Sequence, residues 1–298
     1  MDADAYDEFG LFHENAQEWN LPFDGPPHVV RVAIGLDDGR TISGLRWGAN
    51  TPHLVLLHGG AQNAHTYDTL ALALGVDLIA LDLPGHGHSD GGRDGVLSPA
   101  SMAEDVIVAI SELCDGPITL VGMSLGGMVA MHVATQAPEL IARVGFVDIT
   151  PGVNQEKAQH ITAFINGPQG FESFEDLLER TMEHNPTRDV KSLRRGILHN
   201  AVQLDDGTWI WRWARHRSGP MDVPSRPSDL WGLLASIKQP ALLIRGMSPG
   251  SVVDDDDEAT FLATAQNGAV RRVERAGHSV QGDQPLVLAE ILTEFLTR

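Results

Sequence analysis

The order of apolar and polar residues along this chain predicts a regular alternation of strands and helices. Short unbroken apolar runs are typical of strands buried on both faces, as in a parallel sheet. Longer stretches between them carry apolar residues three and four positions apart, which is the spacing of one helix face. The expected strands are 53–57, 77–82, 117–121, 144–148, 241–245 and 270–274, and the expected helices are 66–74, 98–113, 127–137, 258–266 and 285–296. This alternation predicts an α/β fold whose sheet carries helices on both faces.

The sequence before this alternation predicts a short helix followed by a hairpin. Apolar and aromatic residues from Tyr6 to Trp19 recur at helical spacing, so we expect an amphipathic helix packed on the body of the protein. The runs 29–34 and 41–47 are strand-like, and Asp38-Gly39 between them is a strong signal for a tight turn. The chain is therefore expected to enter its sheet through an antiparallel pair.

Residues 151–240 break the alternation of strand and helix. They contain two amphipathic stretches, 174–184 and 190–200, and a run in which Trp209, Trp211 and Trp213 alternate with other residues. They also hold 11 acidic and 11 basic residues, so the whole net charge of −19 falls on the rest of the chain. We therefore expect an N-terminal helical segment (1–28), a core (29–150 and 241–298) and a mainly helical cap, or lid, inserted over one edge of the sheet (151–240).

Charge and cysteine content narrow the class of protein. A net charge of −19 in 298 residues argues against nucleic acid and anionic membrane surfaces as partners. Residues 1–20 are acidic without a basic residue, unlike a signal peptide, and no apolar run reaches the length of a membrane span. The lone Cys114 precludes an internal disulfide. We expect a cytoplasmic protein without stable membrane insertion; these patterns do not determine its oligomeric state.

The candidate chemistry centres on Ser124, in the stretch Gly122-Met123-Ser124-Leu125-Gly126. An expected strand enters this stretch and an expected helix leaves it, so the serine lies at the apex of a sharp turn. The two glycines have the G-x-S-x-G spacing of a nucleophile elbow, where the turn leaves no room for side chains on either flank. Such a hydroxyl is exposed to an incoming carbonyl group and lies at a helix N-terminus, where free N–H groups can stabilise an oxyanion.

A serine nucleophile needs a base and a carboxylate that orients the base. The leading base is His278, which lies in a glycine-containing loop after the last expected strand. For the acid, Asp148 competes with the run Asp254–Asp257. Four adjacent carboxylates repel one another and are typical of the acidic first turn of a helix. The sequence therefore favours Asp148, at a strand end, and leaves the run as the alternative.

Two backbone amides are expected to form the oxyanion hole. Leu125, directly after the serine, supplies one, and Gly60, in the loop after an early strand, supplies the other. The residues expected to line the substrate site are His58, Gly59, Met123, Trp209 and Trp211. The tryptophans can also be interpreted as residues that pack the cap onto the sheet. The large area that a tryptophan buries favours this interpretation.

No metal or other cofactor is expected. His86, His88 and Asp90 are a conceivable group of metal ligands, but they lie in a turn and no further residue supplies a ligand at a standard spacing. A structural role in the turn is the simpler interpretation of these residues.

These motifs together resemble the α/β-hydrolase family, from residue 29 to the C-terminus. The matching stretches are Leu57-His58-Gly59-Gly60, Leu83-Pro84-Gly85-His86-Gly87-His88-Ser89, Gly122-Met123-Ser124-Leu125-Gly126-Gly127 and Gly277-His278-Ser279. A closer similarity to a group of actinobacterial esterases rests on residues 57–66, 189–196, 209–212 and 277–285. The resemblance implies an eight-stranded, mostly parallel sheet with a cap after the sixth strand. Many members carry an acid after the seventh strand, but Ser248 and Pro249 stand there in this chain, which again favours Asp148.

The sequence thus predicts a serine hydrolase that cleaves carboxylic esters of small to medium acyl groups through an acyl-enzyme. Lactones, thioesters and carbon–carbon bonds of dicarbonyl compounds are alternative targets, because the same three residues serve all of them. An alternative of another class is a ligand sensor on the same fold, which a complete set of nucleophile, base, acid and oxyanion loop argues against.

Overall fold

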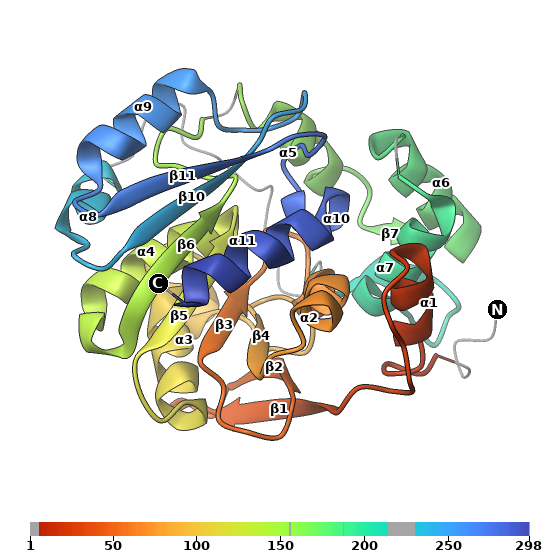
Figure 1. Cartoon of the computed structure of the whole chain (residues 1–298). Coiled ribbons are helices and arrows are strands. Elements are labelled where there is room, and N and C mark those ends of the chain that lie inside the picture. Colours follow the sequence, from red (N-terminus) through yellow and green to blue (C-terminus); the bar gives the residue numbers. More distant parts are fainter. Residues whose placement is uncertain (1–5, 155, 187, 214–229, 298) are drawn as a thin grey trace.

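The computed structural model describes residues 6–154, 156–186, 188–213 and 230–297, and its centre is an eight-stranded sheet (Figure 1). The strand order is β1-β2-β4-β3-β5-β6-β10-β11. Only β2 runs against the others: it pairs antiparallel with β1 and with β4, and every later pair is parallel. The strands are β1 (Val29–Gly35), β2 (Thr41–Trp47), β3 (Leu54–Leu57), β4 (Leu78–Asp82), β5 (Ile118–Met123), β6 (Ile141–Val147), β10 (Ala241–Gly246) and β11 (Gly268–Val273). The expected mostly parallel sheet of eight strands and the expected hairpin are confirmed.

Helices cover both faces of the sheet because successive side chains of a strand point to opposite faces. In β3, Val55 and Leu57 belong to the cluster beneath one helical layer, and Leu54 and Leu56 belong to the cluster beneath the other. The first layer contains α3 (Pro99–Leu113), α4 (Leu125–Gln136), α8 (Leu230–Ser236) and α9 (Asp255–Thr264). The second contains α1 (Phe12–Glu18), α2 (Asp68–Leu74), α10 (Val280–Asp283) and α11 (Pro285–Thr297).

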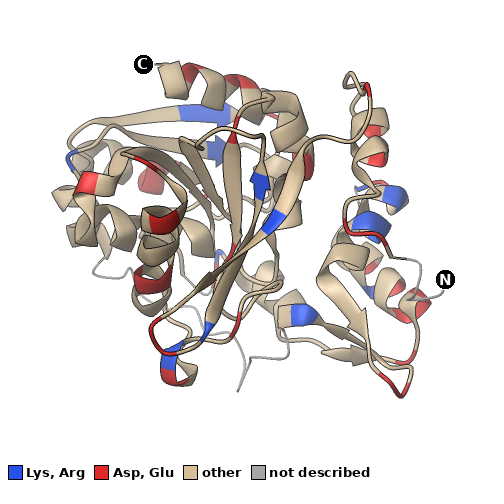
Figure 2. Cartoon of the chain, turned by 90° about the horizontal axis from the view of Figure 1, so that it is seen from below, with Lys and Arg blue, Asp and Glu red and all other residues tan. Residues whose placement is uncertain are grey.

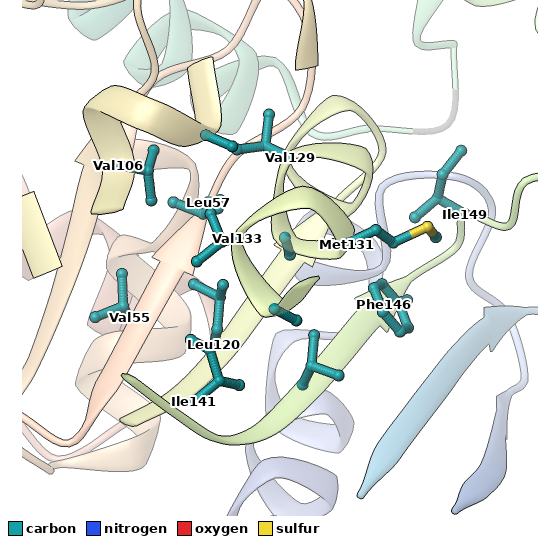
Figure 3. Close-up of a cluster of buried hydrophobic side chains, with 14 of the residues drawn as sticks. Val55, Leu57, Val106, Leu120, Val129, Met131, Val133, Ile141, Phe146 and Ile149 are labelled. Carbon is teal, nitrogen blue, oxygen red and sulfur yellow. The ribbon is translucent and has the colours of Figure 1, made fainter. Parts of the chain in front are cut away.

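The buried cluster of the first layer holds the nucleophile strand and its helix together (Figure 3). Leu120 of β5 packs there with Val129 and Val133 of α4, and all three side chains are fully buried. The turn between β5 and α4 is therefore supported by side chains on both of its flanks.

The chain leaves the sheet after β6 and forms a small unit, which we call the cap, before it returns at β10 (Figure 1). This unit contains α5 (Gln159–Ile165), α6 (Phe174–His184), α7 (Val190–Asn200) and a three-stranded sheet in the order β7-β9-β8. Its strands are β7 (Gly170–Phe171), β8 (Ala201–Gln203) and β9 (Trp209–Trp211). Residues 214–229 of the expected cap, like residues 1–5 of the expected N-terminal segment, lie outside the described residues.

The end of the expected cap differs from the sequence expectation. Helix α8 falls within 151–240, yet its Leu234 belongs to the core cluster beneath α3 and α4 and is fully buried. Short 3-10 turns lie at Ala64–Tyr67, Arg93–Gly95 and Pro138–Leu140. Within the described part, no helix combines the length and the apolar character needed to cross a bilayer.

Candidate active site

Ser124 lies in the turn between β5 and α4 with a backbone φ of 51° and ψ of −117°. The flanking glycines are sterically required there. A Cβ at Gly122 would lie 2.1 Å from the carbonyl oxygen of Gly126, and a Cβ at Gly126 would lie 2.3 Å from that of Leu57. Leu125 is the first residue of α4, so its N–H has no acceptor within the helix. The G-x-S-x-G spacing thus produces the expected elbow, with a free amide directly after the serine.

Asp148 lies on the neighbouring strand, at the same edge of the sheet. It directly follows β6, and the Ser124 amide donates to the carbonyl oxygen of Val147 at 3.2 Å. The Asp148 carboxylate is fully buried and accepts hydrogen bonds from the amides of Gly246 and Val252, each at 3.0 Å, and from the Ser251 hydroxyl at 2.6 Å. These three donors hold the Asp148 carboxylate in one orientation.

His278 completes this part of the site from the loop after β11. Its Nδ1 donates to Asp148 Oδ2 at 2.9 Å. Because Nδ1 carries that proton, the neutral ring presents Nε2 as a lone pair. Nε2 is buried and has no hydrogen-bond partner among the described residues. The arrangement has the form of a general base oriented by a buried carboxylate.

Three of the four alternative acids are engaged with other groups. Asp254 and Asp257 form a reciprocal cap at the start of α9 and both pair with Lys157, at 2.7 and 2.6 Å. Asp255 pairs with Arg245 at 2.7 Å. The prediction that this run opens a helix is therefore confirmed, and the hydrogen bond to His278 comes from Asp148.

The loop after β3 leaves the backbone amide of Gly60 unused. The amide of Gly59 donates to Gln62 Oε1 and the amide of Ala61 donates to His86 Nε2, each at 3.1 Å. The Gly60 amide between them has no acceptor within the described part of the chain. The Gly60 and Leu125 amides are therefore both available to a developing oxyanion.

His58 fixes the direction of the Gly60 amide. Its Nε2 accepts from the Leu83 amide at 2.9 Å, so Nδ1 carries the proton and donates to the Gly59 carbonyl oxygen at 2.7 Å. Complete burial lowers the pKa of His58 and keeps the ring neutral. In a trans peptide the C=O and the next N–H point in opposite directions, so the bond to Gly59 also directs the Gly60 N–H.

The residues expected to line the substrate site have different surroundings. Gly59 approaches the nucleophile closely, since a Cβ there would lie 2.5 Å from Met123 Sδ and 3.3 Å from Ser124 Cβ. Trp209 and Trp211 are only 7% and 4% exposed and belong to the apolar cluster of the cap. Trp211 also lines a cavity of about 190 Å³ between the cap and residues 62–66. His58 is fully buried.

Gln62, Arg188 and Asn200 contact the loops of the site. The sequence indicated no role for Gln62 or Asn200, and for Arg188 it left open a solvated helix face or attraction of an anionic substrate. Gln62 lies inside one of the motifs quoted above, but Arg188 and Asn200 lie in the cap. Their partners are distant in sequence, Asp283 and Ala61 respectively. No local pattern marks such contacts.

The residues of the structure that could hold a metal lie away from His86, His88 and Asp90. His86 uses both ring nitrogens within the turn, because Nδ1 bonds the Pro84 carbonyl oxygen and Nε2 accepts from Ala61. Elsewhere in the described chain, His65, Asp68 and His199 bring ligand atoms within 4.8 Å of one another. Their two rings stack in parallel at 3.8 Å, however, and in-plane lone pairs of parallel rings do not converge on one ion.

Both nitrogens of His65 are occupied by carboxylates. Nδ1 bonds Asp68 at 2.9 Å and Nε2 bonds Glu8 at 3.1 Å. Burial lowers the pKa of His65, but the carboxylates of Asp68 and Glu8 together raise it to about 9. The group is therefore a charged hydrogen-bonded cluster in the arrangement observed.

Comparison with known proteins agrees with this geometry. A family model described as the alpha/beta hydrolase family matches residues 54–291. The chain is 41% identical over 298 residues to the esterase Rv0045c of Mycobacterium tuberculosis, covering 97% of this chain and 96% of that protein. A crystal structure of that esterase aligns with a TM-score of 0.86 and 40% identity over 99% of each chain. A Xenopus laevis protein named sn-1-specific diacylglycerol lipase ABHD11 is 31% identical and matches 86% of this chain and 80% of its own length. This chain belongs to the α/β-hydrolase family.

Proposed function

We propose that this protein is a serine hydrolase that cleaves carboxylic esters of small to medium acyl groups. Ser124 is the nucleophile, His278 the general base and Asp148 the carboxylate that orients the imidazole. The observation that supports this most strongly is the hydrogen bond from His278 Nδ1 to the buried Asp148. It leaves Nε2 as a base in the family's arrangement of nucleophile, base and acid.

Ester cleavage then proceeds in two balanced steps. The Ser124 oxygen bonds the ester carbonyl carbon while its proton passes to His278 Nε2, and the amides of Gly60 and Leu125 hold the oxyanion. Collapse expels the alcohol, which takes the proton from His278 and leaves the acyl group on Ser124. A water molecule activated by the same nitrogen releases the carboxylic acid and restores the serine hydroxyl.

The relatives and the charge of the chain support a small ester as substrate. One relative is named an esterase and another a diacylglycerol lipase. A net charge of −19 disfavours anionic polymers and anionic surfaces. We assign substrate choice to the inserted segment 151–240, with Gly59, Met123 and Trp211 as proposed contacts. Burial favours a supporting role for His58 and Trp209.

The test is hydrolysis of a p-nitrophenyl ester series from acetate to long acyl chains. Saturable turnover by the wild type is expected on short and medium chains and is lost in Ser124→Ala. Asp148→Asn keeps the shape of the acid but loses its charge, so kcat should fall roughly 10³-fold or more. Asp255→Asn removes a carboxylate of the alternative run, 92% exposed, and is the matched control with unchanged activity.

Two outcomes would contradict parts of this proposal. Full activity of Asp148→Asn together with inactive Asp255→Asn would move the acid to the run Asp254–Asp257. Wild-type protein that turns over no ester in the series would overturn the esterase assignment, and lactones, thioesters and carbon–carbon substrates would be screened next. Saturable binding without any turnover would favour the sensor.

A further inference from the structure

Helix α7 of the cap and Arg188, just before its N-cap, contact the two loops that carry the proposed chemistry. We define the oxyanion loop as residues 58–63 and the histidine loop as residues 277–283. The C-terminal end of α7 reaches the first loop and the residues directly before its N-terminal end reach the second. Figure 1 shows α7 beside α1, at the side of the molecule where the cap meets the core.

At the C-terminal end, Asn200 is bound to the backbone of the oxyanion loop. Its Nδ2 donates to the Ala61 carbonyl oxygen at 2.7 Å, and Asn63 Nδ2 returns a bond to the His199 carbonyl oxygen at 2.9 Å. Ala61 has a φ of 61°, a left-handed conformation that is unfavourable for alanine. Ala61 is bonded on both sides: its N–H donates to His86 Nε2 and its carbonyl oxygen accepts from Asn200, and these bonds hold that conformation and with it the neighbouring Gly60.

Before the N-terminal end, Arg188 is bound to the histidine loop. Its Nη2 donates to Asp283 Oδ1 at 3.0 Å, and the other oxygen of Asp283 accepts from the Gly277 amide at 2.9 Å. Arg188 also lies against the loop backbone, because a Cβ at Gly282 would be 2.1 Å from its Nη2. Asp283 therefore connects a cation of the cap to the residue that directly precedes His278.

The middle of α7 is held by the N-terminal helix. Arg195 is only 5% exposed and contacts Glu18 and, at 3.6 Å, Glu14 of α1. The position of α7 is thus restrained from both sides. Between its two ends and residues 62–66 lies the cavity of about 190 Å³, which Arg188 and Asn200 both line.

We propose that Asn200 and Arg188 are positioning residues, which hold the Gly60 amide and His278 in working geometry through Ala61 and Asp283. This inference rests on the proposed function, because it is that function which gives the two loops their roles. The cap then does more than enclose the substrate: α7, together with Arg188 just before it, sets the oxyanion loop and the histidine loop relative to each other. A displacement of either loop should lower kcat, because the rate acceleration that a catalytic group provides depends steeply on its position.

The test compares Asn200→Ala and Arg188→Gln with the wild type on the best ester of the series. Each variant should lower kcat by about tenfold to hundredfold with KM changed by less than about threefold. A trifluoromethyl ketone adds to a serine as a tetrahedral oxyanion, so its affinity should fall by the same factor as kcat/KM. Arg188→Lys keeps a cation for Asp283 and should recover most of the lost rate.

Matched controls come from residues of the same types with other partners. Asn267 donates its Nδ2 to the Lys238 carbonyl oxygen, and Arg180 lies over the Phe164 ring in the cap. Asn267→Ala and Arg180→Gln should keep wild-type kcat and inhibitor affinity. Asn200→Asp, which has the shape of asparagine but no N–H donor, covers the case in which the alanine variant fails to fold.

The outcomes separate this inference from the proposed function. Suppose that the wild type is active and Ser124→Ala is inactive. If the Asn200 and Arg188 variants then fold and keep an unchanged kcat, only the positioning roles are overturned. The same would follow if the variants lost only thermal stability, since the residues would then merely fasten the cap. An inactive wild type would overturn both proposals together.

Discussion

At the scale of single residues, His58 shows how a buried side chain can act on the chemistry without touching substrate. It is fully buried and joins the Leu83 amide to the Gly59 carbonyl oxygen. His58→Ala leaves both groups unsatisfied beside a new cavity. We expect the free energy of unfolding to fall by about 2–4 kcal/mol and kcat to fall by about tenfold or more.

Urea unfolding and ester kinetics on the same preparations would check this. His53→Ala, on an exposed histidine just before β3, is the control and should change neither quantity measurably. A destabilised His58→Ala protein with wild-type kcat would show that the ring supports the fold but not the amide of Gly60.

Residues of this site differ in how far the sequence predicts them. The elbow at Ser124 is predictable because its glycine spacing is a local steric requirement: a Cβ at Gly122 would lie 2.1 Å from the carbonyl oxygen of Gly126. The acid remains open between Asp148 and the run after β10 until the fold brings Asp148 within 2.9 Å of His278. Asn200 is beyond sequence reasoning, because its partner Ala61 is 139 positions away.

At the scale of elements, the contact between α1 and α7 should contribute to the stability of the whole protein. Arg195 brings a buried cation to Glu14 and Glu18, whose side chains are 29% and 25% exposed. Arg195→Met keeps much of the apolar stem and removes the charge, so the two carboxylates lose their partner. We expect a loss of about 1–3 kcal/mol, which corresponds to a few degrees in Tm for a chain of this size.

Differential scanning calorimetry at low and high salt would measure this loss. Because the pair is largely buried, the loss should persist in high salt, which screens exposed ion pairs much more strongly. Arg271→Met, at an exposed pair with Glu294, is the control and should change Tm little. An effect of Arg195→Met that disappears in high salt would contradict a buried role.

The positions of the helices along the chain were more predictable than the surfaces against which they pack. The amphipathic stretches 174–184 and 190–200 are the observed helices α6 and α7, with the same bounds. An amphipathic pattern states that a helix has an apolar face, but it does not name the surface that covers it. For this reason α8 fell within the expected cap by its sequence position, although Leu234 packs in the core.

At the scale of the whole molecule, charge is spread unevenly and the parts are joined through buried polar groups. Acidic residues outnumber basic ones by 40 to 21, and they lie on helices of both layers (Figure 2). Self-repulsion at this net charge opposes compaction. Contacts that bring opposite charges together between the N-terminal segment, the core and the cap offset part of this repulsion, and we expect them to contribute to the stability of the folded state.

The cluster around His65 is such a contact, and it predicts how stability depends on pH. His65 of the core bonds Asp68 and Glu8 and stacks on His199 of the cap. The carboxylates raise its pKa from 6.5 to about 9, against the opposing effect of burial. A raised pKa in the folded state means that the stabilisation is complete below pH 6.5 and is lost as the pH rises toward 9.

Glu8 sets the lower limit of the same window. Burial raises its pKa, but hydrogen bonds from His65 and Arg31 outweigh this and lower it from 4.5 to about 2. Its contribution is therefore present above pH 4.5 and is lost as the pH falls toward 2. The contributions of His65 and Glu8 are therefore both complete between about pH 4.5 and 6.5.

Removing the charge of His65 should remove this pH dependence. His65→Gln keeps a polar side chain that can still hydrogen-bond, but it cannot be protonated, so the wild type should exceed it in stability by roughly 2 kcal/mol at pH 6. The difference should shrink steadily between pH 6.5 and 9, as measured by urea unfolding at each pH. His13→Gln, on an exposed histidine of α1 that bonds only the Gly10 carbonyl oxygen, should show no such trend. A constant difference between wild type and His65→Gln from pH 6 to 9 would mean that folding does not raise the pKa of His65, and that packing against His199 rather than charge joins the three parts.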